Sequence, residues 1–167
     1  MGFLAGPLAA PSPITNDTAQ LPEGVIESLD GEGRGVARGV GSNEGKAIFI
    51  EGALPGERVT YRSYLVKPNY ELARVEQVYR ESSARVKPAC EFFGNCGGCA
   101  MQHVEFRTQV AVKQRVLEDA FERIGKVEPE SLLRPIYGTP WGYRHRARLS
   151  VRYVRKKGIA LVGFREK

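Results

Sequence analysis

The chain has 167 residues, of which 42% are hydrophobic and 26% are charged, and its formal net charge is +6. These proportions are typical of a soluble globular protein and exclude a disordered one. No run of residues approaches the roughly 18 apolar residues that a membrane-spanning helix needs, so we expect no membrane partner. The length is sufficient for one ordinary domain or two small ones.

The first 20 residues differ in composition from the rest of the chain. They carry a single charged residue, Asp17, and are interrupted by Pro7, Pro11 and Pro13. The apolar patch near Met1 lacks the basic segment that begins a secretory signal. We therefore expect a disordered leader over residues 1–20 and a cytoplasmic chain, in which clustered thiols favour metal binding over disulfides.

Residues 21–83 have the pattern of a small β unit. Short runs rich in β-branched and aromatic residues alternate with turns that contain Gly, Asp or Pro. Such a unit, with five short strands and glycine turns, fits a compact barrel of the OB type, a fold that often binds RNA. Its eight Lys or Arg against ten Asp or Glu equally suit a folding or docking module. The five predicted strands are Gly24–Leu29, Gly35–Val40, Lys46–Ile50, Arg58–Val66 and Leu72–Tyr79, with a polar turn over residues 41–45 and with the last strand the most compatible with a helix.

All three cysteines of the chain lie in one stretch, which reads C-E-F-F-G-N-C-G-G-C-A-M-Q-H and ends at His103. The spacing of Cys90, Cys96 and Cys99 allows three thiolates to converge on one metal centre, because the two glycines between the last pair put no side chain in the way. Unrelated thiols are a poor explanation, since an odd count leaves one thiol over if two of them pair. Zinc held by the three cysteines and His103, and an iron–sulfur cluster with a fourth ligand elsewhere, both fit the spacing.

After the cysteines the apolar pattern changes to a period of 3.6 residues. The pattern predicts a helix that packs an apolar stripe and ends near Gly125, with no chemistry assigned to it. The stripe consists of Phe106, Val110, Leu117, Phe121 and Ile124.

The basic excess of the chain is confined to its last segment, residues 138–167, which holds nine Lys or Arg against one Glu. We expect an extended strand over Trp141–Tyr153, a basic hairpin turn at Arg155–Gly158 and a return strand at Ile159–Phe164. Arginine pairs bidentately with phosphate oxygens, so an arginine face here indicates a surface for RNA or DNA, against the alternative of a solvated strand face. In a strand of period two the arginine face consists of Arg144, Arg146, Arg148 and Arg152, and the opposite face of Tyr143, His145, Ala147, Leu149, Val151 and Tyr153.

Three stretches together resemble one family, the bacterial 23S rRNA (uracil-C5)-methyltransferases of the TRAM-domain, iron–sulfur RNA uridine-C5 methyltransferases. The first is G-V-I-E-S-L-D-G-E-G-R-G-V-A with I-F-I-E-G-A-L-P-G-E-R-V, the second is the cysteine stretch, and the third is P-W-G-Y-R-H-R-A-R-L-S-V with V-G-F-R. The resemblance covers about residues 22–167. It implies a mixed α+β chain, with a TRAM-type OB-like barrel over residues 21–83 and, over residues 84–167, an iron–sulfur loop, a helix and the start of a β-rich central RNA-binding domain.

The resemblance also implies a chemistry. In the family, cysteines matching Cys90, Cys96 and Cys99 bind a [4Fe-4S] cluster together with a fourth cysteine after the G-F-R strand, and His103 is not a ligand. The catalytic domain, which binds S-adenosylmethionine and carries a cysteine nucleophile, matches no part of this chain, so no catalytic residue is assigned. We therefore expect the N-terminal, 23S rRNA-recognising part of a methyltransferase, a monomer that is inactive by itself.

Two other functions fit parts of the sequence. A stand-alone zinc-containing RNA-binding protein would use the three cysteines and His103 as ligands. A small electron-transfer protein is a weaker hypothesis, because a β barrel and a basic face contribute nothing to electron transfer.

Overall fold

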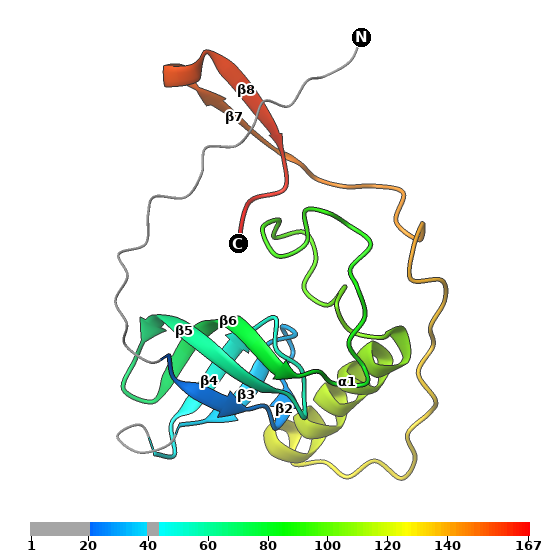
Figure 1. Cartoon of the computed structure of the whole chain (residues 1–167). Coiled ribbons are helices and arrows are strands. Elements are labelled where there is room, and N and C mark those ends of the chain that lie inside the picture. Colours follow the sequence, from blue (N-terminus) through cyan, green and yellow to red (C-terminus); the bar gives the residue numbers. More distant parts are fainter. Residues whose placement is uncertain (1–20, 40–43) are drawn as a thin grey trace.

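A computed structural model describes residues 21–39 and 44–167 of the chain. In chain order these residues form a β-sheet unit, the cysteine loop, helix α1, a long connection and a two-stranded hairpin (Figure 1). The predicted leader over residues 1–20, Val40 and most of the turn expected at 41–45 lie outside the described residues. The predicted mixed α+β class is confirmed in its coarser form, a small β unit with one α-helix.

Six strands form the main sheet, in the order β1-β5-β6-β4-β3-β2. Neighbouring strands run antiparallel except β4 and β6, which run parallel. The two edge strands, β1 and β2, are joined by only two residues, Ile26 and Glu27. The bounds are β1 Glu23–Val25, β2 Ser28–Leu29, β3 Gly35–Arg38, β4 Ala47–Glu51, β5 Arg58–Val66 and β6 Tyr70–Arg80.

The sheet is strongly bent. The pairing of β5 with β6 has three register shifts, between Arg58 and Val59, between Thr60 and Tyr61, and between Ser63 and Leu65. Bulges of this kind bend a strand and increase its twist. β1 also lies against β3, and the buried apolar side chains of the sheet unit form a single core. The core consists of Ile26, Ala37, Ile48, Ile50, Ala53, Val59, Tyr61 and Ala73.

The strand predictions are largely confirmed, with one correction. The segment Leu72–Tyr79, for which a helix was the main competitor, lies within strand β6, because Glu71 and Ala73 alternate with more exposed neighbours. The single strand predicted at Gly24–Leu29 is wrong in one respect, since it divides into β1 and β2 at Ile26 and Glu27. There the backbone N–H of Ile26 donates to the carbonyl of Glu57 and that of Glu27 to the carbonyl of Val36, so the strand leaves one neighbour for another.

The predicted helix is confirmed over α1, Phe106–Asp119, and continues as a π-helix over Ala120–Gly125. Lys126 has a φ of 51°, a left-handed conformation that ends the helix next to the predicted stop at Gly125. None of its residues is fully buried, so the stripe is less enclosed than expected. Among the described residues no helix is both long and apolar enough to span a membrane.

The predicted hairpin is confirmed as β7, Ser150–Val154, and β8, Ile159–Gly163, joined by a basic 3₁₀ turn at Arg155–Lys157. The strand predicted over Trp141–Tyr153 is wrong over residues 141–149, which have no regular secondary structure. The physical reason is that β8 offers only five residues for pairing, so the backbone groups before Ser150 find no partner strand. The period-two argument therefore applies to Arg152 and not to Arg144, Arg146 or Arg148.

Candidate metal loop and basic surface

The cysteine loop begins and ends at two short segments that pair with each other, residues 84–86 and 103–105, called the neck below. Residues 84–86 run antiparallel to residues 103–105, with the N–H of Val86 donating to the carbonyl of His103 at 2.9 Å and the N–H of Glu105 to that of Ala84 at 2.7 Å. Glu105 caps the N-terminus of α1, because its carboxylate accepts from the Thr108 N–H at 2.9 Å. Hydrogen bonds from the backbone N–H groups of Arg107 and then of Thr108 lower the pKa of Glu105. The neck thus fixes both ends of the loop.

A buried ion pair holds the neck on the sheet. The carboxylate of Glu57 is fully buried and accepts from Arg85 through Nε at 2.6 Å and Nη2 at 2.7 Å. Two backbone N–H groups, of Leu54 at 2.8 Å and Ser82 at 3.1 Å, also donate to it. Burial alone raises the pKa of Glu57, but these four hydrogen bonds outweigh it and hold the pKa below its ordinary 4.5. Arg85 further donates to the carbonyl of Gly52 at 2.7 Å.

The side chain of His103, at the end of the loop, is buried. It is 2% exposed, its ring packs on that of Phe93 at 5.3 Å, and neither ring nitrogen has a hydrogen-bond partner among the described residues. Burial, followed by the positive charge of Arg85, lowers the pKa of His103 from 6.5 to about 4. The ring is therefore uncharged at neutral pH.

The three cysteines lie in the same loop but do not form a complete ligand set. Cys90 and Cys96 are half-buried and Cys99 is exposed. Over residues 21–39 and 44–167, no three His, Cys, Asp or Glu side chains are grouped closely enough to hold a metal ion. Two details suit a cluster: the Gly98 N–H donates to Cys96 Sγ at 3.4 Å, and the Gln102 side chain accepts from the Cys90 N–H at 3.3 Å. Thiols of this kind are the donors that iron–sulfur clusters use, but the three side chains are not gathered around one point in the described structure.

The arginines predicted to bind nucleic acid are all exposed, but only Arg152 lies in a strand. Arg144 lies over the ring of Tyr143, at 5.5 Å from its centre. Within the described residues none of the nine Lys or Arg of residues 138–167 pairs with a carboxylate. In contrast, six of the eight Lys or Arg of residues 21–83 form ion pairs with acids of the sheet unit. Among the described residues the last segment therefore holds nine cations without an ion pair, against two in residues 21–83.

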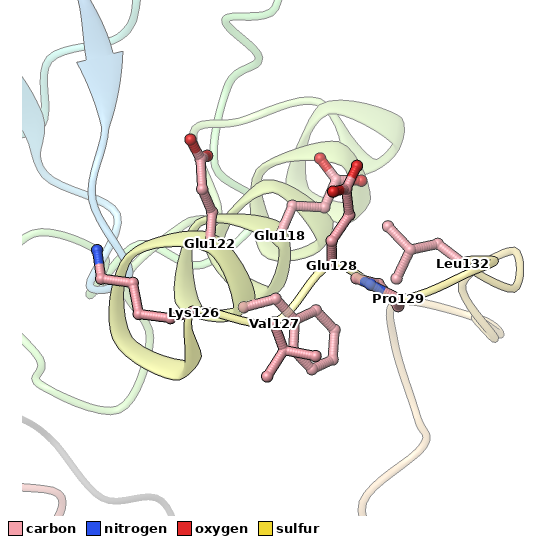
Figure 2. A pocket seen from close by; sticks show the side chains of 8 residues that line it. Glu118, Glu122, Lys126, Val127, Glu128, Pro129 and Leu132 are labelled. Atoms are coloured by element: carbon pink, nitrogen blue, oxygen red, sulfur yellow. The ribbon is translucent and has the colours of Figure 1, made fainter.

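Two hollows flank α1. One of about 670 Å³ lies between α1 and the connection over residues 133–143, where the rings of Phe106 and Tyr137 meet edge to face. The other, of about 560 Å³, lies at the end of the π-helix, and Figure 2 shows the carboxyl groups of Glu118, Glu122 and Glu128 on the same side of it. Three carboxylates repel phosphate, so the second hollow is unsuited to bind RNA.

Sequence reasoning missed several residues that shape the site. Glu57 and Arg85 were assigned no role, because a buried pair between a turn and a linker leaves no periodic signal. Gln102 is part of the cysteine stretch quoted above, but its contact with Cys90 depends on how the loop folds and leaves no signal in the sequence.

Comparisons with known proteins support the resemblance, although no family model matches the chain. The chain is 64% identical over 143 residues to the 23S rRNA (uracil(1939)-C(5))-methyltransferase RlmD of Nitrosospira multiformis, which covers 86% of this chain and 32% of that protein. It is 54% identical over 166 residues to the protein of the same name from Burkholderia thailandensis, covering 98% of this chain and 35% of the relative. The protein of that name from Dechloromonas aromatica is 58% identical over 146 residues, 87% of this chain and 33% of the relative.

Over most of its length the chain is thus homologous to part of proteins that carry the name 23S rRNA (uracil(1939)-C(5))-methyltransferase. It spans about a third of the length of the curated relatives it matches.

Proposed function

We propose that the chain is the RNA-recognising and cluster-binding N-terminal part of an S-adenosylmethionine-dependent methyltransferase that forms 5-methyluridine in 23S rRNA. The observation that carries the proposal is the unpaired basic segment, residues 138–167, in a chain closely similar to proteins named for that reaction. Because ribosomal RNA is the proposed substrate, the chain is proposed to act in the cytoplasm. No residue is assigned to methyl transfer.

The sheet unit is proposed to be the TRAM-type, OB-like domain of the family. Support comes from the bent pairing of β5 with β6 and from the two-residue link between the edge strands β1 and β2. Because the arginines of this unit are largely paired with its own acids, we assign the phosphate contacts to the last segment and not to the sheet.

The cysteine loop is proposed to bind a [4Fe-4S] cluster through Cys90, Cys96 and Cys99, with a fourth cysteine beyond Lys167. The segment after β8 supports this, because the Gly97 N–H donates to the carbonyl of Arg165 at 2.8 Å and the chain thus runs along the loop toward Lys167. Residues that follow Lys167 would then be delivered to the same loop. Zinc bound with His103 is not favoured, since that ring is buried against Phe93.

Salt-dependent RNA binding tests the proposed function. The double variant Arg146→Ala/Arg148→Ala is expected to bind a 23S rRNA fragment more weakly and to lower the slope of log K against log salt by roughly 1.5, because each lost phosphate contact contributes about 0.7–0.9. The matched control is Arg62→Ala/Arg74→Ala, which removes the same charge from positions paired with Glu76 and Glu51. An equal slope change in both double variants would show that net charge, and not this surface, binds the RNA.

A further inference from the structure

The chain that leaves β8 turns back onto the cysteine loop. Besides the Gly97 contact with Arg165, the N–H of Lys167 donates to the carbonyl of Asn95 at 3.0 Å, which makes an antiparallel bridge between Cys96 and Glu166. Residues 164–167, called the strap below, thus pair with the loop through a single β-bridge. Among the described residues, every backbone hydrogen bond that residues 150–167 make outside the hairpin ends on the cysteine loop.

The two glycines between Cys96 and Cys99 lie where the strap approaches most closely. A Cβ built on Gly97 would be 2.8 Å from the carbonyl oxygen of Arg165, and one built on Gly98 would be 3.1 Å from the ring of Phe164. The first distance is shorter than real side chains tolerate, and the atom it meets is backbone, which has no rotamer to change. Any side chain at Gly97 must therefore push the strap away.

Two further contacts, both with the ring of Phe93, connect the strap to the neck. Lys167 Nζ lies 5.8 Å from the centre of the Phe93 ring, and Phe93 in turn covers the buried His103. The strap, the loop and the neck thus form one continuous set of contacts. The hairpin at the other end of the strap carries Arg152 and the basic turn Arg155–Lys157.

We propose that Gly97 and Gly98 are positioning residues, which form a docking groove for the strap and thereby attach the basic β7–β8 hairpin to the cysteine loop. The loop then serves both as the attachment site of the hairpin and as the proposed metal site. An isolated two-stranded hairpin is only marginally stable in water, so a fixed attachment is needed if its cations are to meet RNA in one arrangement. The docking stands on the contacts alone, and only its effect on RNA binding rests on the proposed function.

Amide hydrogen exchange of the 167-residue chain, purified without oxygen, tests the docking. In Gly97→Ala the amides of residues 97 and 167 are expected to exchange about tenfold faster, because the hydrogen bonds to Arg165 and Asn95 are lost. The matched control is Gly163→Ala, just before the strap, where an added Cβ meets no heavy atom within 4 Å. Exchange in the sheet, at Ile48 for example, should be unchanged in both variants. Unchanged strap exchange in Gly97→Ala would overturn the proposal.

A double-mutant cycle separates docking from a general weakening of the loop. Gly98→Ala should loosen the strap in the wild-type background and have little further effect in Phe164→Ala, where the ring it would meet is gone. Additive effects of the two substitutions would show that Gly98 does not act through Phe164 and would contradict the groove.

RNA binding of the same variants decides whether the docking serves recognition. Gly97→Ala removes no charge, yet it should weaken binding to a 23S rRNA fragment by roughly two- to tenfold, because the hairpin is no longer held in place. A released strap with unchanged RNA affinity would leave the docking intact and refute its role in recognition. Absence of RNA binding in the wild-type chain would refute the proposed function, while hydrogen exchange would still decide the docking.

Discussion

The buried ion pair between Glu57 and Arg85 allows the cost of a substitution in free energy of unfolding to be predicted. Glu57→Gln keeps the size of the side chain but replaces one acceptor oxygen by an N–H₂ group, although four N–H groups point at the carboxylate. At least one of them loses its acceptor, and Arg85 keeps a positive charge without a counterion. Removing one partner of such a pair typically costs about 3–5 kcal/mol, a large fraction of the roughly 5–15 kcal/mol that stabilise a domain.

Urea unfolding at pH 7 measures this cost, with Glu27→Gln as the control. Glu27 pairs with Arg38 at 3.9 Å on the surface, where both side chains are more than half exposed, so its loss should cost less than about 1 kcal/mol. A cost below about 1 kcal/mol for Glu57→Gln as well would refute the reasoning from burial. The low pKa of Glu57 gives a second signature: its contribution is present above pH 4.5 and is lost as the pH falls through the folded-state pKa, a loss that Glu57→Gln should not show.

Two further substitutions test the interior. His103 has a folded-state pKa of about 4 against an ordinary 6.5, so the unfolded chain binds more protons between these values, and the free energy of unfolding should fall by about 3 kcal/mol as the pH drops from 7 to 4. His103→Phe should abolish that part of the pH dependence and leave stability at pH 7 unchanged or higher, since the buried ring nitrogens have no partners in the described structure. An unaltered pH profile of the urea unfolding free energy would contradict the assignment of this pH dependence to His103. Gly35→Ala places a Cβ 2.9 Å from the carbonyl oxygen of Ala53 in the core and should cost about 1–3 kcal/mol in thermal unfolding, whereas Gly138→Ala, in open space, should be neutral; equal midpoints for the two variants would argue against the tight packing.

Local patterns predicted the elements whose causes are local. The alternation in Arg58–Val66 predicted β5 with its bounds, and the 3.6-residue period of the apolar stripe predicted α1. The break at Ile26 and Glu27 was not predictable in this way, because it arises when one strand pairs with two different neighbours.

The candidate site likewise combines a feature that a local pattern predicted with contacts that no local pattern could predict. The spacing of the cysteines indicated the loop, but the strap against Gly97 and the pair of Glu57 with Arg85 join residues distant in sequence, for which no period exists. The glycines were interpreted as making room for a cluster, whereas the structure shows that they also make room for the strap. Alternation of arginines misled over residues 141–149, since a period of two describes a strand only where a partner strand is present.

The absorption spectrum of the chain purified without oxygen, with iron, zinc and sulfide assayed on the same sample, tests the proposed cluster most directly. If Cys90, Cys96 and Cys99 bind an iron–sulfur cluster, the sample should show broad visible absorption with iron and sulfide bound, lost in Cys96→Ser and retained in His103→Ala. One colourless zinc ion per chain, released by His103→Ala, would contradict the assignment of an iron–sulfur cluster and support the Cys3His alternative.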